Sequence, residues 1–257
     1  MRVSLRDVPG FAFTAARLFG IQSAFSYERM LGIGFGHAIE PLLRPLRGQG
    51  DGSRYHEALA RESRFFNSHP YLASLAIGAA ARSELEGVSG ERIERLRSAL
   101  CGPLGALGDR LVWAGWLPAC VGLGLALATR GAGGWAVAAF LVLYNVVHVL
   151  LRIWGLRAGW MVGLRVSVAL SHPVLKRGLA VVGPLAAVSV GAALPMVLGW
   201  AVRLGGPSDP TWIGLSGAAA GTLVFLGAAR LVGTRLSGLV LAIAVLGAAA
   251  LGGALWP

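Results

Sequence analysis

The chain has 257 residues, of which 55% are hydrophobic and only 14% are charged, and its mean hydropathy is +0.66. Because soluble domains carry roughly a quarter charged residues, this composition excludes an ordinary soluble enzyme and indicates a membrane protein embedded in a lipid bilayer. The net charge of +11 comes from basic residues that lie mostly between apolar runs, without interleaved aromatic residues for stacking bases. Nucleic acid is therefore not an expected partner.

The first 110 residues predict helices at the cytoplasmic face or the membrane interface. Residues 11–21 have apolar side chains at helical spacing, which indicates a short amphipathic helix. Ser26 is expected to cap a second helix, and a turn at 47–53 precedes a charged helix over 54–66. The charged residues of this helix are expected to form a solvated face: Arg54, Glu57, Arg61, Glu62 and Arg64.

An apolar run at 71–81 follows a break at His69-Pro70, because the residue before a proline is disfavoured in the α-helical region. The run is too short to span a bilayer, which needs about twenty residues in a helix. We therefore expect it to form one arm of a re-entrant hairpin. Residues 82–98 are charged again and predict an exposed helix–turn–helix.

Five later runs are long enough to cross a membrane, and Pro118, Pro184 and Pro195 predict kinks within them. The predicted fold class is all-α, a polytopic membrane protein of about five spans with amphipathic and re-entrant helices. An N-terminal part, 1–110, and a transmembrane part, 111–257, would form one integrated membrane domain. The predicted spans cover 111–129, 135–151, 179–202, 212–229 and 237–256.

Basic residues are distributed unequally between the predicted spans. Residues 1–110 contain fourteen arginines, and the connections 152–178 and 230–236 contain five and two basic residues. The alternate connections, 130–134 and 203–211, contain one each. Because basic loops stay in the cytoplasm, this pattern predicts a cytoplasmic N-terminus and a C-terminus outside.

The segment 99–116 is the strongest candidate for a functional site. Asp109 is the only acidic residue between Glu94 and Asp209, and a carboxylate beside hydrocarbon is expected to face a polar cavity or a partner. The glycines and the proline here predict a broken helix, which at membrane depth is tolerated where protein or a water-filled cavity surrounds it. The residues expected to line a solute pathway are Gly102, Pro103, Leu104, Gly108, Asp109 and Trp113.

Two interpretations of Asp109 stay open from the residues alone. Its carboxylate can accept hydroxyl groups while the indole of Trp113 covers an apolar sugar face, which suits a polyol. Alternatively, it is a charge at a helix N-terminus that the macrodipole stabilises. His148 suits either a proton relay or a bond to a neighbouring helix, and Arg152 is expected to be an end residue whose side chain reaches the interface.

The sequence contains no GxxxxGK[ST] loop and no GxGxxG motif after a strand, so a nucleotide-dependent activity is disfavoured. The five histidines and two cysteines show no metal-ligand spacing. We therefore expect no cofactor, no metal and no catalytic residue.

Four segments carry a resemblance that covers about residues 20–200. FSYERM at 25–30 resembles an "(F/Y)ERM" element, and FFNSHP at 65–70 resembles "FFN-x-x-P". GPLGALGD at 102–109 is similar to "GPLAGxGD", and the fourth match is the "(F/Y)N" at 144–145. Together they resemble the IID membrane subunit of the mannose/fructose/sorbose family of the bacterial phosphoenolpyruvate-dependent sugar phosphotransferase system. The motif residues beyond the Asp109 segment are Glu28, Arg29, Phe66, Asn67, Pro70 and Asn145.

The resemblance implies a multi-pass subunit of the bacterial inner membrane that pairs with a IIC subunit in a hetero-oligomer. Such a complex moves a hexose that cytoplasmic IIA and IIB proteins phosphorylate, and the IID chain itself is not an enzyme. Arg110 departs from the small residue or proline usual in the family, and it can alter sugar choice or pair with Asp109. The alternative is a membrane scaffold or orphan regulatory subunit that recruits cytoplasmic proteins through the charged helices at 54–66 and 82–98.

Overall fold

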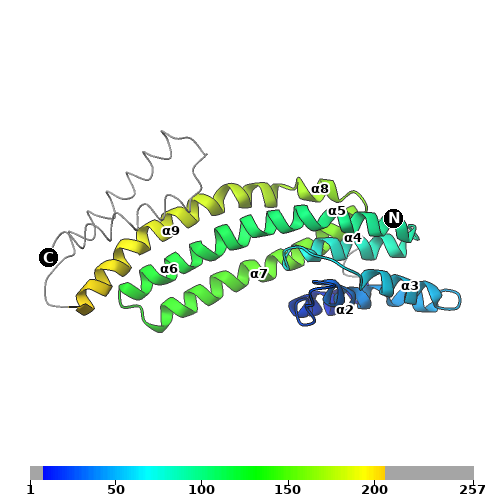
Figure 1. The fold of residues 1–257 in the computed structure, drawn as a ribbon, viewed down its shortest axis with the longest axis horizontal. Helices are drawn as coiled ribbons and strands as arrows, with labels where there is room; N and C mark the ends of the chain where they lie inside the picture. Colours follow the sequence, from blue (N-terminus) through cyan, green and yellow to red (C-terminus); the bar gives the residue numbers. More distant parts are fainter. Residues whose placement is uncertain (1–7, 206–257) are drawn as a thin grey trace. The chain divides into compact units, whose positions relative to one another are not determined.

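A computed structural model describes residues 8–205 of the chain. Within this range the helices are joined by turns and loops, and the β-structure consists of two isolated bridges, which confirms the all-α prediction for these residues (Figure 1). Short 3₁₀ segments, η2 (Leu18–Gly20) and η3 (Arg44–Gly48), and one π-helical segment, η4 (Asp109–Trp116), join the α-helices. The α-helices are α1 (Phe11–Arg17), α2 (Gly32–Leu43), α3 (Ser53–Glu62), α4 (Ala73–Leu85), α5 (Gly90–Gly108), α6 (Leu117–Thr129), α7 (Gly134–Val162), α8 (Val166–Leu170) and α9 (Pro173–Gly205).

The chain divides into two compact units. The first contains the chain up to Cys120 together with Ala138–Ala186, and it holds every candidate site residue. The second contains, among the described residues, Val121–Val137 and Ala187–Gly205, and within it a Cβ at Gly122 would lie 2.6 Å from the Ser189 carbonyl carbon. Each unit thus has its own close helix contacts.

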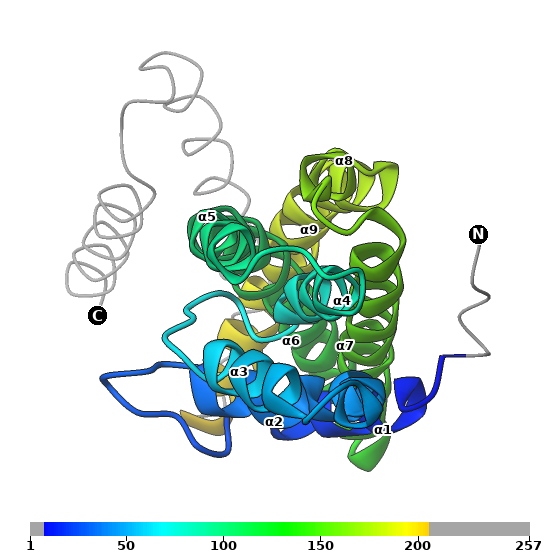
Figure 2. The ribbon, with the colours of Figure 1, turned by 90° about the vertical axis from the view of Figure 1, so that its right-hand side faces the viewer.

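Helix α4 lies at the centre of the first unit, between α5 and α7 (Figure 2). Its close approach to α7 depends on glycines, because a Cβ at Gly78 would lie 2.2 Å from the Leu156 carbonyl oxygen. A Cβ at Gly159 would lie 1.9 Å from the Leu75 carbonyl oxygen. Small residues permit such backbone contact between helices. The run predicted at 71–81 is therefore a buried helix, and its re-entrant insertion into a bilayer stays a prediction.

Three helical stretches are long and apolar enough to cross a membrane: Gly90–Thr129, Gly134–Val162 and Val168–Leu194. They correspond to the first three predicted spans. Helix α7 continues to Val162, so the connection predicted at 152–178 begins as helix rather than loop. The spans predicted at 212–229 and 237–256 lie outside the described residues, and both the count of five and the orientation stay predictions.

The prediction of a broken helix at 99–116 is wrong. Helix α5 passes through Gly102 and Pro103 and ends at Gly108, and η4 and α6 follow without a turn between them. Glycine and proline are tolerated within membrane helices because, in hydrocarbon, unsatisfied backbone groups cost more than local helical distortion. The irregularity takes the form of π-helix at Asp109–Trp116, a form of helix that is often found at functional sites.

Ser26 does not cap a helix, because α2 begins only at Gly32. Instead Ser26 closes a turn: its carbonyl accepts the Met30 N–H at 2.7 Å, and its hydroxyl accepts the Arg29 N–H at 3.2 Å. The backbone of 29–31 is bonded to Phe66, which keeps these residues out of a helix.

The face of α3 predicted to be solvated is solvated only in part. Glu62 is fully buried and pairs with Arg97, whose Nε lies 3.0 Å from Glu62 Oε2. Arg61 pairs with the buried Glu84 at 2.8 Å. The end of α3 packs against neighbouring helices, so Glu62 and Glu84 lie buried beside arginines rather than in solvent.

Candidate functional site

Two of the motif segments lie side by side. The Leu31 N–H donates to the Phe66 carbonyl at 2.9 Å, and the Phe66 N–H donates to the Arg29 carbonyl at 3.3 Å. The buried Phe66 ring packs against Phe35 of α2, with centroids 4.7 Å apart. Segment 65–70 is thereby held at one end, and its other end leads into α4.

His69 joins this segment to the third motif. Its carbonyl accepts the Ala73 N–H at 3.0 Å, which starts α4, and its Nδ1 accepts the Tyr71 N–H at 3.2 Å. A Cβ at Gly108 would lie 2.1 Å from the His69 Cβ, so the contact between these segments requires glycine. The His69 ring also lies 5.4 Å from the Trp113 ring.

One ring nitrogen of His69 has no partner in the described part of the chain. Nε2 is buried and accepts or donates no hydrogen bond there. Burial lowers the pKa of His69 to about 4, although the nearby Asp109 carboxylate acts in the opposite direction. The imidazole is therefore neutral at physiological pH, beside an exposed carboxylate and an indole that is 45% exposed.

Tyr71 connects His69 to α7. Its ring stacks on His148, with centroids 4.0 Å apart and planes 11° apart. Its hydroxyl lies 2.6 Å from the Tyr144 hydroxyl, and the Arg152 guanidinium lies 4.9 Å from its ring centroid. We call His69, Tyr71, Trp113, Tyr144, His148 and Arg152 the aromatic cluster.

Arg152 is 2% exposed, so the prediction that it is an end residue reaching the interface is wrong. Its Nε donates to His148 Nε2 at 2.7 Å, and its Nη1 donates to the Leu18 carbonyl of η2. It also lies over the Phe19 and Tyr71 rings. These contacts replace water around the charge, and no carboxylate pairs with Arg152 within residues 8–205.

The structure brings some predicted site residues together and leaves others apart. Trp113 belongs to the aromatic cluster, Gly108 lies against His69, and the charge of Asp109 acts on His69. Asn145 is exposed, and its amide donates to the Leu141 carbonyl of its own helix at 2.8 Å. Of the remaining predicted residues, Leu104 and Phe66 are buried, Pro70 is half-buried, and Gly102, Pro103, Glu28, Arg29 and Asn67 are exposed.

Sequence reasoning missed the roles of His69, Tyr71 and Arg152. A signal for part of the cluster exists, because Tyr144, His148 and Arg152 are four residues apart and share one face of a helix. Tyr71 had no such signal, since its partner hydroxyl is 73 residues away. Across the described range no group of three or more His, Cys, Asp or Glu side chains is placed to hold a metal ion.

The fold and the cluster define a helical membrane protein that encloses polar and aromatic side chains between its helices. The chain belongs to the IID components of the mannose/fructose/sorbose family of the phosphotransferase system (PTS), since the model of that family matches residues 11–206.

Three curated relatives have similar sequences. The fructose permease IID component of Bacillus subtilis (strain 168) is 29% identical over 148 residues, which are 56% of this chain and 53% of the relative. The mannose-specific EIID component of Escherichia coli (strain K12) is 27% identical over 168 residues, 63% of this chain and 58% of the relative. The sorbose-specific EIID component of Klebsiella pneumoniae is 29% identical over 153 residues, 56% of this chain and 54% of the relative. The chain thus spans little more than half the length of the curated relatives it matches.

Two solved structures share the fold. One is the cryo-EM structure of the mannose transporter ManYZ in complex with microcin E492, with a TM-score of 0.57, 20% identity, and coverage of 90% of this chain and 98% of that one. The other is described as the structure of a membrane protein, with a TM-score of 0.67, 18% identity, and coverage of 99% and 98%. At 20% and 18% sequence identity, the similarity to these two structures shows a shared fold.

Proposed function

We propose that the chain is the IID membrane subunit of a PTS sugar permease, which pairs with a IIC subunit to translocate a hexose across the bacterial inner membrane. Cytoplasmic IIA and IIB proteins phosphorylate the sugar, and this chain carries no phosphoryl group. Its N-terminus lies in the cytoplasm and its C-terminus outside. The observation that carries the proposal is the convergence of the 65–70 and 102–109 motif segments on the aromatic cluster.

The residues at the edge of the aromatic cluster suit a sugar. The half-exposed Trp113 indole offers an apolar surface for a sugar ring face, and the exposed Asp109 carboxylate accepts hydroxyl hydrogens. The neutral His69 contributes a buried nitrogen that has no protein partner among the described residues. Asp109 and Trp113 lie in η4, and Arg110, also exposed, lies beside Asp109 where it can affect sugar choice.

An apolar face of α7 supports a membrane-embedded subunit with a helical partner. Leu141, Val142, Val146 and Leu150 are exposed and form a shallow groove along this helix. Apolar side chains at such positions suit lipid tails or the helices of a second membrane subunit.

The test is to purify the chain with and without a candidate IIC subunit and to titrate hexoses calorimetrically. We expect binding by the complex alone, weakened about tenfold or more by Asp109→Asn or Trp113→Leu, because each change removes a direct contact to the sugar. Glu57→Gln on the exposed side of α3 is the matched control and leaves binding unchanged.

Unchanged binding by both site variants would place the sugar site on the partner subunit. Failure to form any complex would favour the scaffold alternative. For that alternative, charge reversal at the exposed Arg64 is the informative variant, because Arg61 is held by Glu84 and its reversal would disturb the fold.

A further inference from the structure

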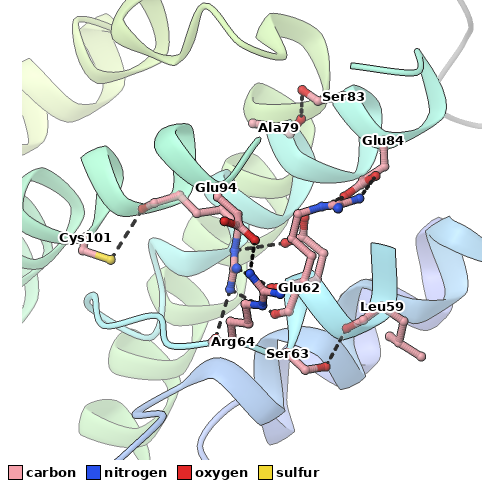
Figure 3. A network of polar contacts seen from close by, with 11 residues as sticks. Leu59, Glu62, Ser63, Arg64, Ala79, Ser83, Glu84, Glu94 and Cys101 are labelled. Carbon is pink, nitrogen blue, oxygen red and sulfur yellow. Dashed lines mark hydrogen bonds and ion pairs between the residues drawn. The ribbon is translucent and has the colours of Figure 1, made fainter. Parts of the chain in front are cut away.

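A pair of buried carboxyl groups, Glu62 and Glu84, lies where α3 meets α4 (Figure 3). Glu62 is the last residue of α3 and is 0% exposed, and Glu84 of α4 is 4% exposed. Glu84 acts on Glu62 through its charge and through a side-chain hydrogen bond, and both effects raise the pKa of Glu62. Two buried carboxylates that interact in this way repel each other when both are ionised, so one of them is favoured in its protonated form.

The hydrogen bonds around the pair show which carboxyl group is ionised. Arg61 Nε donates to Glu84 Oε1 at 2.8 Å, and Arg61 Nη2 donates to Glu84 Oε2 at 3.0 Å. This is the bidentate geometry in which a guanidinium binds a carboxylate most strongly. Glu84 is thus the ionised carboxylate, because Arg61 neutralises its negative charge.

Glu62 lacks such donors. In the part of the chain that the structure describes, neither of its carboxyl oxygens receives an aligned hydrogen bond. Arg97 Nε lies 3.0 Å from Glu62 Oε2, but this nitrogen is also without an aligned partner there. A fully buried carboxylate without hydrogen-bond donors is costly, whereas a protonated carboxyl group can itself donate.

Arg97 has other partners for its guanidinium. Nη1 donates to the Arg61 carbonyl at 2.6 Å, and Nη2 donates to the carbonyls of Glu62 and Arg64 at 3.0 and 3.1 Å. These carbonyls lie at the end of α3, where a helix has unsatisfied acceptors and a negative dipole end. Arg97 therefore acts as a cap for α3, and its role does not depend on an ionised Glu62.

The other charged groups nearby are already paired. Arg64 and Glu94 form an ion pair that is more exposed to solvent, and the charge of Glu94 also acts on Arg61. The groups that face Glu62 are thus Arg61 on its own helix, Glu84 on α4 and Arg97 on α5.

We propose that Glu62 and Glu84 form a proton-binding site in which Glu62 keeps the proton and donates a hydrogen bond to a carboxylate oxygen of Glu84. The proton is taken up from solvent when α3 packs on α4 and returns to solvent when the pair separates. This hydrogen bond holds the end of α3 against α4, and from there the chain passes to Phe66 and His69. The site thus couples proton binding to the placement of the segment that enters the aromatic cluster.

The electrostatics agree with this arrangement. Burial, reinforced by the charge of Glu84 and opposed by that of Arg97, raises the pKa of Glu62 to about 8. An unfolded chain releases this proton near pH 4.5, whereas the folded chain retains it up to about pH 8. The free energy of unfolding therefore falls as pH rises through this window. The unfolding equilibrium constant rises by up to tenfold per pH unit and levels off above the window.

The experiment uses the full chain in lipid nanodiscs and measures its melting temperature from about pH 5 to about pH 9. Glu62→Gln is the test variant, because its carboxamide is neutral and can still donate to Glu84. Glu57→Gln, on the exposed part of the same helix, is the matched control. We expect the wild type and the control to lose stability with rising pH, and Glu62→Gln to lose less over the same window.

A strong loss of stability in Glu62→Gln at neutral pH, with no difference in pH dependence from the wild type, would overturn the proposal. It would mean that Glu62 is ionised and neutralises Arg97. Infrared spectra of the wild type give a readout that does not depend on folding of the variant. A protonated-carboxyl C=O stretch that disappears with a midpoint above pH 7 supports the shared proton, and its absence at neutral pH excludes it.

Discussion

The hydroxyl groups of Tyr71 and Tyr144 lie 2.6 Å apart and join the start of α4 to the middle of α7 across 73 residues of sequence. The same Tyr71 ring stacks on His148, one helical turn beyond Tyr144. The link therefore positions the aromatic cluster as well as the two helices. Four consequences of this and related contacts can be measured.

Tyr71→Phe removes the hydroxyl and leaves the ring stacked on His148. We expect a loss of about 1 kcal/mol of stability, because the Tyr144 hydroxyl loses its partner in a half-buried site. Thermal denaturation in detergent measures this loss. Tyr27→Phe is the control, since Tyr27 is 91% exposed, and a double variant with Tyr144→Phe should cost less than the sum of the two single changes.

Gly108→Ala tests the contact between the 102–109 motif and His69. The added Cβ would lie 2.1 Å from the His69 Cβ, so the helix must shift, at a cost of about 1–3 kcal/mol. Gly102→Ala, on the same helix and with open space around it, should be neutral or stabilising by up to about 1 kcal/mol. Equal melting temperatures for the two variants would show that α5 does not approach His69 this closely.

Arg152→Lys retains the charge but lacks the planar group that bonds both His148 and the Leu18 carbonyl. We expect the N-terminal segment at 11–20 to loosen, with amide hydrogen exchange there about tenfold faster, which corresponds to about 1.4 kcal/mol. Arg177→Lys, at an exposed position on α9, should leave this exchange unchanged.

Glu40→Gln removes a carboxylate that accepts hydrogen bonds from Arg17, Arg44, Arg47 and Tyr55. The hydrogen bond from Arg44, followed by those from Tyr55 and Arg17, lowers the pKa of Glu40 to about 2. Its contribution to stability is therefore present above pH 4.5 and is lost as pH falls toward 2. We expect a cost of about 1–2 kcal/mol at neutral pH, since the surrounding arginines are partly solvated.

Melting temperatures at decreasing pH test the sign of this effect. Wild type and Glu40→Gln should differ at neutral pH and converge in acid, whereas Glu91→Gln, at an exposed residue of α5, should follow the wild type throughout. A difference that grows in acid would contradict the lowered pKa of Glu40.

Much of the fold followed from local patterns. Apolar run length predicted five spans, and the three that fall within residues 8–205 correspond to membrane-length helices, because a bilayer imposes that length on any helix that crosses it. The motif order identified the family correctly. Helix ends were less accurate: Ser26 was expected to start a helix and Pro103 to break one, since local propensity does not include the tertiary bonds of 29–31 or the tolerance of membrane helices for proline.

The aromatic cluster and the burial of Glu62 were decided by tertiary structure. Composition and periodicity place residues on a helix and assign charged ones to water, but they do not say which helices meet. Arg152 is buried because distant groups such as the Leu18 carbonyl replace the water it loses, and Glu62 is buried because α3 packs where Glu84 and Arg97 lie beside it. The sequence by itself determined the membrane class and the family, whereas the contacts that enclose polar groups exist only once the helices have packed.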